Sequence, residues 1–410
     1  MAKILMIVID GAGDRGKITP LSSARKENLN KLAKMGINGI MDTIKPGIRP
    51  GSDTAHLALL GYDPFKYYTG RGPIEAAGVG IELKEGDVAF RVNFGTVEGE
   101  GSVFNKVVVD RRAGRISDTD ELVKAVNENV DLSKFGVEFV FKRGSGHRGA
   151  IVFRGDLSDK ISDVDPKKIG EKVKRCLPLE NNEKARFTAE VVNYFIEKSH
   201  EILEKHPLNV KRAKNGNPKA NVLLLRGAGK VPHLPKFEDM FGMKLACISG
   251  TALIKGVVRI VGGDVLEIRG VTGSKDTNLD AKVEGAINAL KEYDFVLLHI
   301  KAPDEYGHDG DFEGKKNFIE KVDKALKPIL SLDFSEICLV VTADHSTPVK
   351  VRDHTSDPVP VTIVYEDVRP DDVEEFSELK AYKGGLHRIT GNDLFNILLD
   401  LTNRAKKFGA

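Results

Sequence analysis

The sequence predicts an α/β protein whose main sheet is largely parallel. Uninterrupted runs of Val, Ile and Leu are typical of strands buried on both faces, and amphipathic helical segments alternate with these runs. A third observation is a charge-rich middle stretch bounded by glycine- and proline-containing loops. This stretch predicts that a second, smaller α/β domain is inserted into the first.

Short apolar runs give the strand predictions, which fall at residues 4–9, 139–142, 150–153, 222–225, 245–248, 295–300, 337–341 and 359–364. Apolar residues that recur every three or four positions give the helix predictions, at 189–205, 280–293, 318–330 and 393–404. The helix at 280–293 has Thr277 or Asn278 available as its cap.

The composition divides the chain into three stretches. Residues 1–78 and 235–410 carry the α/β pattern, whereas residues 79–234 are richer in charge. Gly70-Arg71-Gly72-Pro73 reads as a loop at the first joint, and the glycines and prolines of 227–235 read as a loop at the second. We therefore expect a discontinuous outer domain, 1–78 with 235–410, and an inserted domain at 79–234.

Charge and cysteine content exclude several classes of protein. The 410 residues contain 62 Lys and Arg against 60 Asp and Glu, so the net charge is +2 and gives no overall field for nucleic acid or an anionic membrane. No stretch reaches the ~20 apolar residues of a membrane span. Three isolated cysteines without a Cys-x-x-Cys pair favour a reducing compartment. We expect a cytoplasmic protein that binds neither nucleic acid nor membrane.

A glycine-rich motif directly follows the first strand. Residues 11–16 read Gly-Ala-Gly-Asp-Arg-Gly, the G-x-G-x-x-G pattern of dinucleotide-binding folds. Thr19-Pro20 interrupts the helix that should follow at once, and Asp10 would place its charge against a pyrophosphate. A nucleotide-binding dehydrogenase is therefore only a minor alternative.

Polar residues gather where three predicted strands end. They are Asp10 after 4–9, Asp304 and His308 after 295–300, and Asp344, His345 and His354 after 337–341. The carboxyl ends of strands in an open α/β sheet meet at one edge, and grouped carboxylates repel one another unless cations neutralise them. Carboxylate and neutral imidazole suit Mn, Zn, Co or Mg, so the pattern predicts a divalent-metal centre. His200, His206 and His233 have no such neighbours and receive no role.

A second motif, Pro50-Gly51-Ser52-Asp53-Thr54-Ala55-His56, precedes or opens a helix. Ser52 at or near a helix N-terminus would face an anion such as phosphate. Serine and aspartate are also common helix caps, so the motif alone leaves both interpretations open.

The third motif consists of basic residues in the middle stretch, close to glycines. They are Arg111, Arg112, Arg115, His147, Arg148 and Arg226. Guanidinium groups bind carboxylate and phosphate in two-pronged fashion, although surface arginines are usually only solvated. Aromatic residues do not interleave with them, which argues against single-stranded nucleic acid.

These motifs resemble those of the archaeal-type cofactor-independent phosphoglycerate mutases, members of the alkaline phosphatase superfamily. The resemblance runs nearly end to end. The matching segments are Ile-Asp-Gly-Ala-Gly-Asp-Arg at 9–15, 50–56, Gly-Arg-Gly-Pro-Ile-Glu-Ala at 70–76, 110–115, 146–148, 226–229, Gly-His-Asp at 307–309 and Ala-Asp-His-Ser-Thr-Pro at 343–348.

The resemblance implies an alkaline-phosphatase-like domain, with helices flanking a mainly parallel sheet, and an inserted phosphotransferase domain. Family members interconvert 3-phosphoglycerate and 2-phosphoglycerate through a phosphoserine enzyme and two divalent metal ions, without 2,3-bisphosphoglycerate. The implied partner is this small-molecule substrate, and a homo-oligomer is compatible with the sequence. Manganese is the first expectation, with Co, Zn or Mg as alternatives.

The family's site residues carry over by analogy. One metal would be held by Asp10, Ser52, Asp344 and His345, and the other by Asp304, His308 and His354. Ser52 would be the nucleophile, with Thr54 as a minor rival, and the arginines of the inserted domain would hold the glycerate and turn it over. Bacterial members carry a histidine pair in the inserted domain that has no evident counterpart here, so His147 is the candidate proton shuttle.

Two further functions compete with the mutase. A metal-dependent phosphatase, phosphodiesterase or phosphonate hydrolase of the same superfamily would share the fold, but it would release its product by hydrolysis. A metal-stabilised binding module would leave the serine and the arginines unused. The Arg-rich insertion favours the mutase over both.

Overall fold

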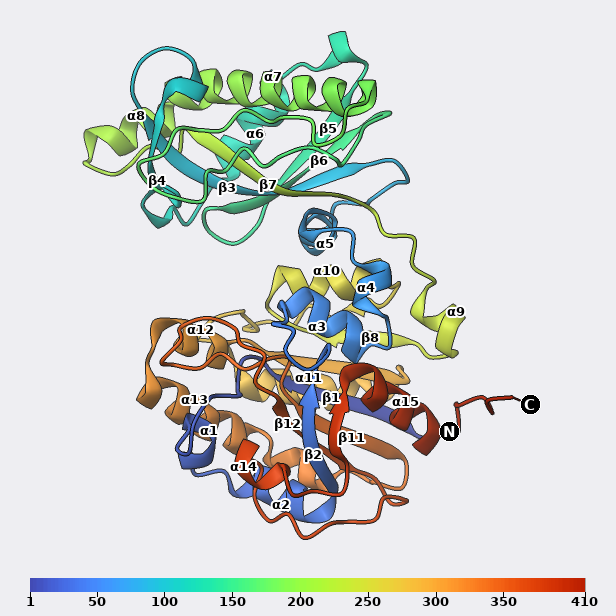
Figure 1. Ribbon diagram of the computed structural model, residues 1–410. Coiled ribbons are helices and arrows are strands. Elements are labelled where there is room, and N and C mark those ends of the chain that lie inside the picture. Colours follow the sequence, from blue (N-terminus) through green and yellow to red (C-terminus); the bar gives the residue numbers. More distant parts are fainter. Residues whose placement is uncertain (410) are drawn as a thin grey trace. The chain divides into compact units, whose positions relative to one another are not determined.

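The computed structural model describes residues 1–409 and divides into two compact units. Unit 1 comprises Met1–Tyr68 and Leu234–Ala410, and unit 2 is the continuous stretch Thr69–His233, drawn from blue to yellow-green in Figure 1. Unit 2 thus begins at Thr69 rather than at residue 79. The reason is helix α5 (Arg71–Gly78), which packs against three strands of unit 2.

Unit 1 is built on an eight-stranded sheet with the order β13-β2-β12-β11-β1-β10-β8-β9. Neighbouring strands are parallel except that β12 runs antiparallel to both β11 and β2. The strands are β1 (Lys3–Ile9), β2 (Ile37–Asp42), β8 (Leu245–Ile248), β9 (Asp264–Val265), β10 (Phe295–Ile300), β11 (Ile337–Thr342), β12 (Val359–Val364) and β13 (His387–Thr390). The largely parallel main sheet is confirmed, and β2, β9 and β13 are strands that the sequence analysis missed.

Strand β1 lies in the interior of this sheet, between β10 and β11. Every residue from Ile4 to Ile9 is fully buried, which accounts for the unbroken apolar run. Val8 pairs with His299 of β10 and with Thr342 of β11, so the three strands end at nearly the same level. This register brings the residues that follow the three strands to one edge of the sheet.

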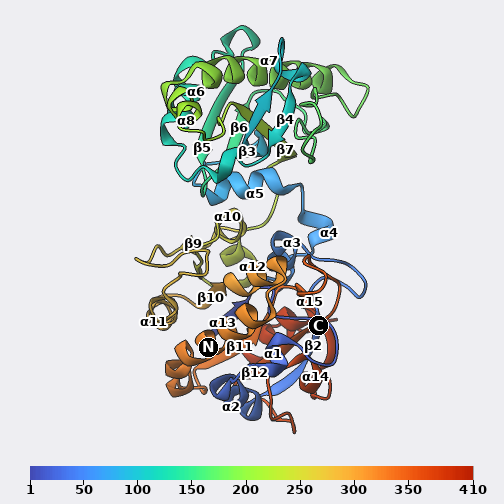
Figure 2. The same cartoon turned by 90° about the vertical axis from the view of Figure 1, so that its left-hand side faces the viewer.

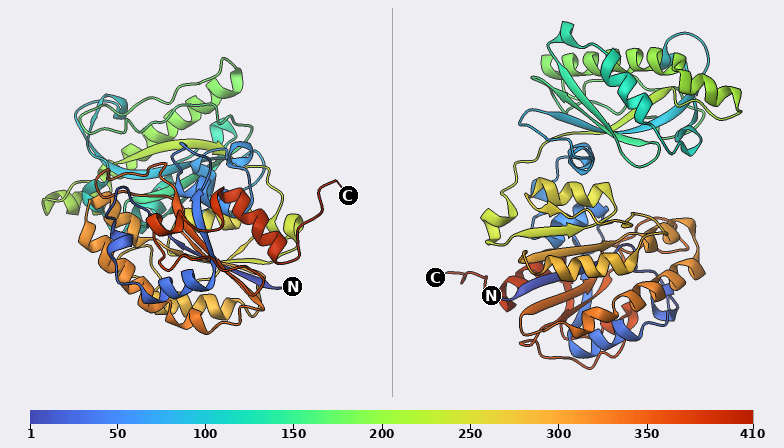
Figure 3. Two further views of the ribbon diagram at one scale, coloured as in Figure 1. Left: turned by 60° about the horizontal axis from the view of Figure 1, so that its bottom comes forward. Right: turned by 180° about the vertical axis from the view of Figure 1, so that it is seen from behind.

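Helices cover both faces of the sheet. Helices α2, α11 and α13 adjoin one another on one face, and α3, α10 and α15 adjoin on the other (Figures 2 and 3). The helical elements of unit 1 are α1 (Pro20–Ser23), α2 (Glu27–Met35), α3 (Ser52–Leu59), α4 (Pro64–Tyr67), α9 (Phe237–Phe241), α10 (Ala252–Ile260), α11 (Leu279–Ala289), α12 (Ala302–Asp309), α13 (Phe312–Ala325), the 3-10 turn at Lys327–Ser331, α14 (Glu378–Ala381) and α15 (Gly391–Leu401). Asn278, one of the two predicted caps, accepts the Ala281 N–H at the start of α11.

Unit 2 is built on an antiparallel sheet, in which β3 pairs with β4, β6 and β7, and β6 pairs with β5. Its elements are α5, β3 (Val88–Glu98), β4 (Val107–Asp110), α6 (Asp120–Asn129), β5 (Glu138–Arg143), β6 (Arg148–Arg154), α7 (Glu183–Lys205), α8 (Pro207–Lys214) and β7 (Val222–Lys230), with 3-10 turns at Val103–Asn105, Ala113–Arg115 and Ser133–Phe135. The runs at 139–142, 150–153 and 222–225 do form strands here, but in an antiparallel sheet.

Strand β3 separates two cores in unit 2. Val88, Phe90, Val92 and Phe94 belong to the larger core, to which α6 and α7 also contribute. Ala89 points to the opposite face and packs in a small core with residues of α5 and β6. Because side chains alternate along a strand, Arg91 shares that opposite face with Ala89.

No helix within residues 1–409 combines the length and the apolar character that crossing a lipid bilayer requires.

Candidate active site

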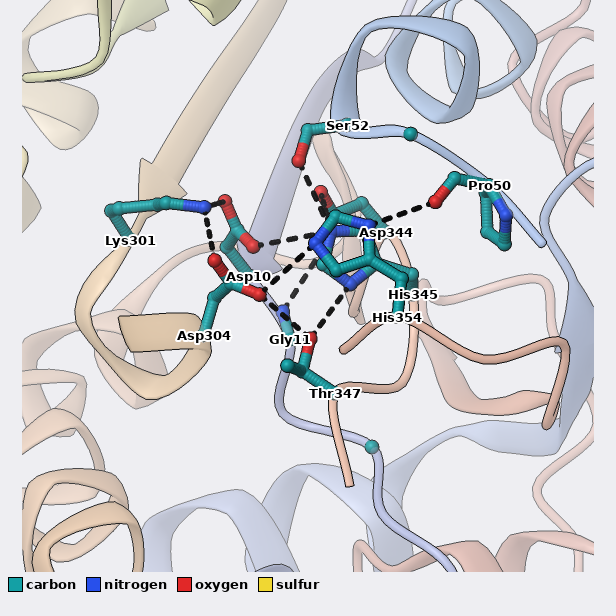
Figure 4. Close-up of polar contacts among 12 residues, drawn as sticks. Asp10, Gly11, Pro50, Ser52, Lys301, Asp304, Asp344, His345, Thr347 and His354 are labelled. Carbon is teal, nitrogen blue, oxygen red and sulfur yellow. Dashed lines mark hydrogen bonds and ion pairs between the residues drawn. The ribbon is translucent and has the colours of Figure 1, made fainter. Parts of the chain in front are cut away.

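Three buried aspartates meet at the edge of the unit 1 sheet where β1, β10 and β11 end (Figure 4). Asp10 directly follows β1, Asp344 comes two residues after β11, and Asp304 lies in the first turn of α12, which follows β10. Asp10 and Asp344 are 0% exposed and Asp304 is 2% exposed. Three carboxylates this deeply buried require nearby cations to be stable when ionised.

The first ligand group consists of Asp10, Asp344 and His345. The Nε2 atom of His345 lies 3.5 Å from Oδ1 of Asp10 and 3.3 Å from Oδ2 of Asp344. Both of these carboxylate oxygens are buried without a hydrogen-bond partner among the described residues. Unpaired oxygens facing an imidazole nitrogen fit a divalent cation.

The second ligand group consists of Asp304, His308 and His354. The Nε2 atoms of both histidines lie 3.4 Å from Oδ1 of Asp304. Their Nδ1 atoms hydrogen-bond backbone carbonyls, at 3.0 Å to Arg352 and 2.9 Å to Pro50. Such backbone acceptors orient the rings of metal-binding histidines, so this group also fits a divalent cation.

Thr347 connects the two groups, and sequence analysis gave it no role. Its hydroxyl donates to Oδ1 of Asp304 at 2.7 Å, so its oxygen accepts the Nδ1–H of His345 at 3.0 Å. The Nε2 atom of His345 is then the unprotonated nitrogen that faces the site.

Ser52 is the first residue of α3, and its side chain does not cap that helix. Gly51 is the N-cap, and Thr54 exchanges hydrogen bonds with the backbone of Gly51. The Ser52 hydroxyl instead donates to Nε2 of His345 at 3.0 Å. Of the two interpretations that the sequence left open, this geometry favours the reactive or anion-binding one for Ser52, and it gives Thr54 a structural role.

Two further residues contact Asp10, and the sequence analysis missed both. The Oδ2 atom of Asp10 accepts hydrogen bonds from Nε2 of His299 at 2.8 Å and from Nζ of Lys301 at 3.1 Å. Lys301 also donates to Oδ2 of Asp304, so one ammonium joins the two ligand groups. A histidine within the otherwise apolar run Phe295–Ile300 was a signal that could have pointed to His299.

The two aspartates of the first group differ in acidity. Burial and the neighbouring charge of Asp344 raise the pKa of Asp10 to about 6, although Lys301 opposes the increase. Burial also acts to raise the pKa of Asp344, but His345 and His56 outweigh it and hold that pKa at about 2. Because Asp10 has the higher pKa of the two, a bound cation would change its protonation more than that of Asp344, by favouring the ionised carboxylate.

His56, His299 and Asp344 form a third cluster of potential ligands. However, both ring nitrogens of His299 already hydrogen-bond, Nε2 to Asp10 and Nδ1 to Ser249 at 3.1 Å. The Nδ1–H of His56 donates to the backbone carbonyl of Ser52 at 2.7 Å. We therefore interpret this cluster as support for the first ligand group rather than as another metal site.

Arginines gather on the face of the unit 2 sheet that α5 covers. Arg111 forms a two-pronged pair with Asp165, at 3.1 and 2.6 Å, and Arg226 lies 3.9 Å from the same carboxylate. Arg226 of β7 lies opposite Arg91 of β3 in the strand register. The Nε atom of Arg91 lies 3.6 Å from the Glu75 carboxylate and has no hydrogen-bond partner among the described residues. Burial, first of all, and the nearby arginines lower the pKa of Arg91 to about 9.

His147 lies beside this group. Burial and the charges of Arg148, Arg112 and Arg91 lower the pKa of His147 to about 4, so its imidazole is neutral near pH 7. Arg112, Arg148 and Arg115 are exposed, and Arg115 adopts a left-handed backbone conformation next to Gly114. The structure thus brings Arg111, Arg226 and the unpredicted Arg91 together, with the exposed Arg148 near Arg91 and the exposed Arg112 near His147.

Comparisons with known proteins identify the family. A family model described as 2,3-bisphosphoglycerate-independent phosphoglycerate mutase matches residues 33–209. The "2,3-bisphosphoglycerate-independent phosphoglycerate mutase 1" of Archaeoglobus fulgidus is 67% identical over 411 residues, which cover 99% of this chain and 100% of that protein. The chain belongs to this mutase family. Its members are isomerases by name, which favours the mutase over the hydrolase alternatives.

Two solved structures share this fold, and one of them is named as a mutase of the family. A protein from Pyrococcus horikoshii has a TM-score of 0.85 and 40% sequence identity, covering 100% of this chain and 99% of that one. The cofactor-independent phosphoglycerate mutase from Thermoplasma acidophilum has a TM-score of 0.72 and 39% identity, covering 98% of this chain and all of that one. The fold is therefore that of the mutase family along the whole chain.

The G-x-G-x-x-G motif has a packing role in this family member. Gly11 has a φ of 66°, and a Cβ on it would lie 2.7 Å from Cα of Asp304. Ala12 and Gly13 form bridges with Ser346, and the next helix starts only at Pro20. The motif allows two site loops to approach closely, and it does not form the strand–turn–helix of a dinucleotide site.

Lys315 connects the loop that follows β1 with the loop that follows β11. Its fully buried ammonium donates to the carbonyls of Gly13 at 3.0 Å and Thr347 at 2.9 Å, and to Asp14 at 3.1 Å. We expect Lys315→Met to lower the free energy of unfolding by about 3–5 kcal/mol, because it leaves the buried Asp14 carboxylate without its counter-charge and removes one donor from each of the two carbonyls. Urea unfolding measures this loss.

Lys316→Met is the matched control for that measurement. Lys316 is the next residue and pairs on the surface with Glu313, so its replacement should cost less than about 1 kcal/mol. Equal losses in the two variants would contradict the structural role of Lys315.

Proposed function

We propose that this chain interconverts 3-phosphoglycerate and 2-phosphoglycerate through a phosphoserine formed on Ser52. The observation that carries the proposal is the Ser52 hydroxyl, 3.0 Å from His345 and beside two carboxylate–imidazole groups. The names of the 67% identical relative and of the matching family model support the substrate.

Two divalent ions complete the proposed site. Asp10, Ser52, Asp344 and His345 hold one ion, and Asp304, His308 and His354 hold the other. Manganese remains the first expectation, with Co, Zn or Mg as alternatives. When bound, such ions lower the pKa of a serine hydroxyl and neutralise charge on a phosphoryl group.

The chain's own groups then transfer the phosphoryl group in two steps. The Ser52 hydroxyl gives up its proton, Ser52 Oγ attacks phosphorus, and the bond from phosphorus to the substrate oxygen breaks, so that the glycerate oxygen takes up the proton that Ser52 lost. The other glycerate hydroxyl then gives up its proton and attacks the phosphoserine, and the leaving Ser52 Oγ takes up that proton. His147, neutral near pH 7, is the proposed base that accepts the proton in each step and returns it to the leaving oxygen.

Unit 2 is the proposed phosphotransferase and substrate-binding domain, and unit 1 the metal-binding domain. Arg111, Arg226 and Arg91 lie close together and have two carboxylates, Asp165 and Glu75, within ion-pair distance among the described residues, so the cluster carries an excess of positive charge. Such a cluster suits the carboxylate of glycerate, which must be retained between the two steps. Arg112, Arg115 and Arg148 are proposed to contribute at its exposed margin.

The product of the reaction tests the proposal. With Mn present, the protein should convert 3-phosphoglycerate to 2-phosphoglycerate, detected by coupling to enolase, without net release of inorganic phosphate. Release of phosphate in proportion to the substrate consumed would instead identify a hydrolase.

Replacing Arg226 tests the role of the arginine cluster. We expect Arg226→Ala to lower kcat/KM for 3-phosphoglycerate by about 10- to 150-fold, the equivalent of one lost hydrogen bond to a charged group. Metal content should not change. Arg175→Ala is the control, since this guanidinium lies over the Phe104 ring and is exposed. Equal activity in the two variants would remove Arg226 from the substrate site.

Three free, buried cysteines, Cys176, Cys247 and Cys338, support a cytoplasmic location as part of this proposal.

A further inference from the structure

Asp10 has two carboxylate oxygens in very different surroundings. Its Oδ2 accepts hydrogen bonds from His299 and Lys301, whereas its Oδ1 has no partner among the described residues and faces Nε2 of His345 at 3.5 Å. Something must keep the carboxylate in this orientation, because rotation about its terminal bond would exchange the two oxygens.

His299 is better suited than Lys301 to fix that orientation. His299 lies within β10, is 0% exposed, and packs edge-on against the ring of His56 with centroids 5.2 Å apart. The Lys301 side chain is 19% exposed, and its ammonium is shared between Asp10 and Asp304. A neutral imidazole also leaves the full negative charge of Asp10 available to a cation, whereas an ammonium neutralises part of it.

The hydrogen bonds around His299 run in one direction only. An ionised Asp10 has no proton to give, so Nε2 of His299 must donate, and Nδ1 of the neutral ring must accept. Ser249 Oγ lies 3.1 Å from Nδ1 and itself accepts the backbone N–H of Thr251 at 3.1 Å. The Ser249 hydroxyl proton is therefore directed to His299, which fixes the imidazole tautomer.

This chain of hydrogen bonds crosses three adjacent strands of the unit 1 sheet. Ser249 follows β8, His299 lies in β10 and Asp10 follows β1, and these strands are neighbours in the order β1-β10-β8. The parallel register pairs Leu298 with Ile248 and Val8 with His299. His299 therefore lies within a strand, and Ser249 and Asp10 are each the first residue after one, so this chain of hydrogen bonds is held at the edge of the sheet.

We propose that His299, with its tautomer set by Ser249, is a positioning residue that holds Oδ2 of Asp10 and thereby presents Oδ1 to the metal ion. The inference rests on the proposed function only in requiring that Asp10 holds a metal. It adds a part of the site that contacts neither substrate nor metal.

Metal binding by three proteins tests the proposal without using activity. Metal-free wild type, His299→Leu and His299→Gln are titrated with MnCl2 in a calorimeter. Leucine keeps most of the bulk and removes the donor, whereas glutamine keeps a side-chain N–H. We expect the wild type to bind two Mn ions and His299→Leu to bind one of them about 10- to 100-fold more weakly, with His299→Gln recovering most of the loss.

A control and a second variant complete the test. His200→Leu replaces another buried histidine, which bonds a backbone carbonyl in unit 2, and should bind Mn like the wild type. Ser249→Ala should cause a smaller loss in the same direction as His299→Leu, and it carries the test if the leucine variant does not fold.

The outcomes separate this proposal from the proposed function. Wild-type binding by His299→Leu, or binding by His299→Gln as weak as that of His299→Leu, would overturn the positioning role alone. A wild-type protein that takes up no Mn would overturn the two-metal function together with this proposal.

Discussion

Ser52→Ala should lower the turnover of 3-phosphoglycerate by about 10⁴-fold or more, the scale of losing a catalytic nucleophile. The reason is geometric. The Ser52 hydroxyl donates a hydrogen bond to His345, which belongs to the first ligand group. Metal content should remain, since Asp10, Asp344 and His345 are unchanged. Steady-state turnover in the enolase-coupled assay and metal analysis of the same sample measure the two quantities.

Thr54→Ala is the control for the serine variant. Thr54 lies two residues away on α3, and its hydroxyl bonds only the backbone of Gly51 among the contacts described. Loss of this hydroxyl should reduce stability by about 1 kcal/mol and leave turnover nearly unchanged. Full activity in Ser52→Ala, or a loss confined to Thr54→Ala, would refute Ser52 as the nucleophile.

Removal of divalent ions with a chelator should abolish turnover, and added Mn or Co should restore it. Asp10, Asp304 and Asp344 are buried together, and bound cations offset their repulsion. Each ion should also stabilise the fold, by about 4 kcal/mol when present at 1,000 times its Kd. Thermal unfolding with and without Mn therefore gives a second measurement that does not depend on substrate.

The metal experiment has its own matched variant. Asp304→Asn keeps the size of the side chain but removes one of the three charges, so the metal-dependent increase in Tm should shrink. Turnover by a protein shown by elemental analysis to be metal-free would contradict the mechanism.

Continuous apolar runs made much of the main sheet predictable. Strands such as β1 and β10 are buried on both faces, so their sequences consist mostly of Val, Ile and Leu. Strand β3 was missed because Arg91 and Asn93 interrupt its apolar residues, although its large side chains alternate regularly. Strand β13 is four residues long, contains His387 and Arg388, and exists because it pairs with β2. Its formation depends on tertiary pairing rather than on local composition.

The grouping of the proposed metal ligands was predictable because they follow strands that end at one edge of the sheet. The partners of these residues were not predictable, because the apolar run around His299 marks this histidine as buried but does not place it against Asp10 until β10 lies beside β1. The same holds for Arg91, whose relation to Arg226 exists only through the pairing of β3 with β7. Site residues that follow the ends of strands can be predicted from a single sequence. Site residues that meet only because two strands are neighbours cannot.

The central place of β1 has a consequence for synthesis on the ribosome. Residues 3–9 emerge before their two partner strands, which span 295–342 and follow the whole inserted unit. At roughly 5–20 residues per second, this delay is on the order of 15 to 60 s. During that time the apolar segment has no partner strand on the nascent polypeptide. A ribosome-associated chaperone that shields this segment should therefore raise the yield of native enzyme.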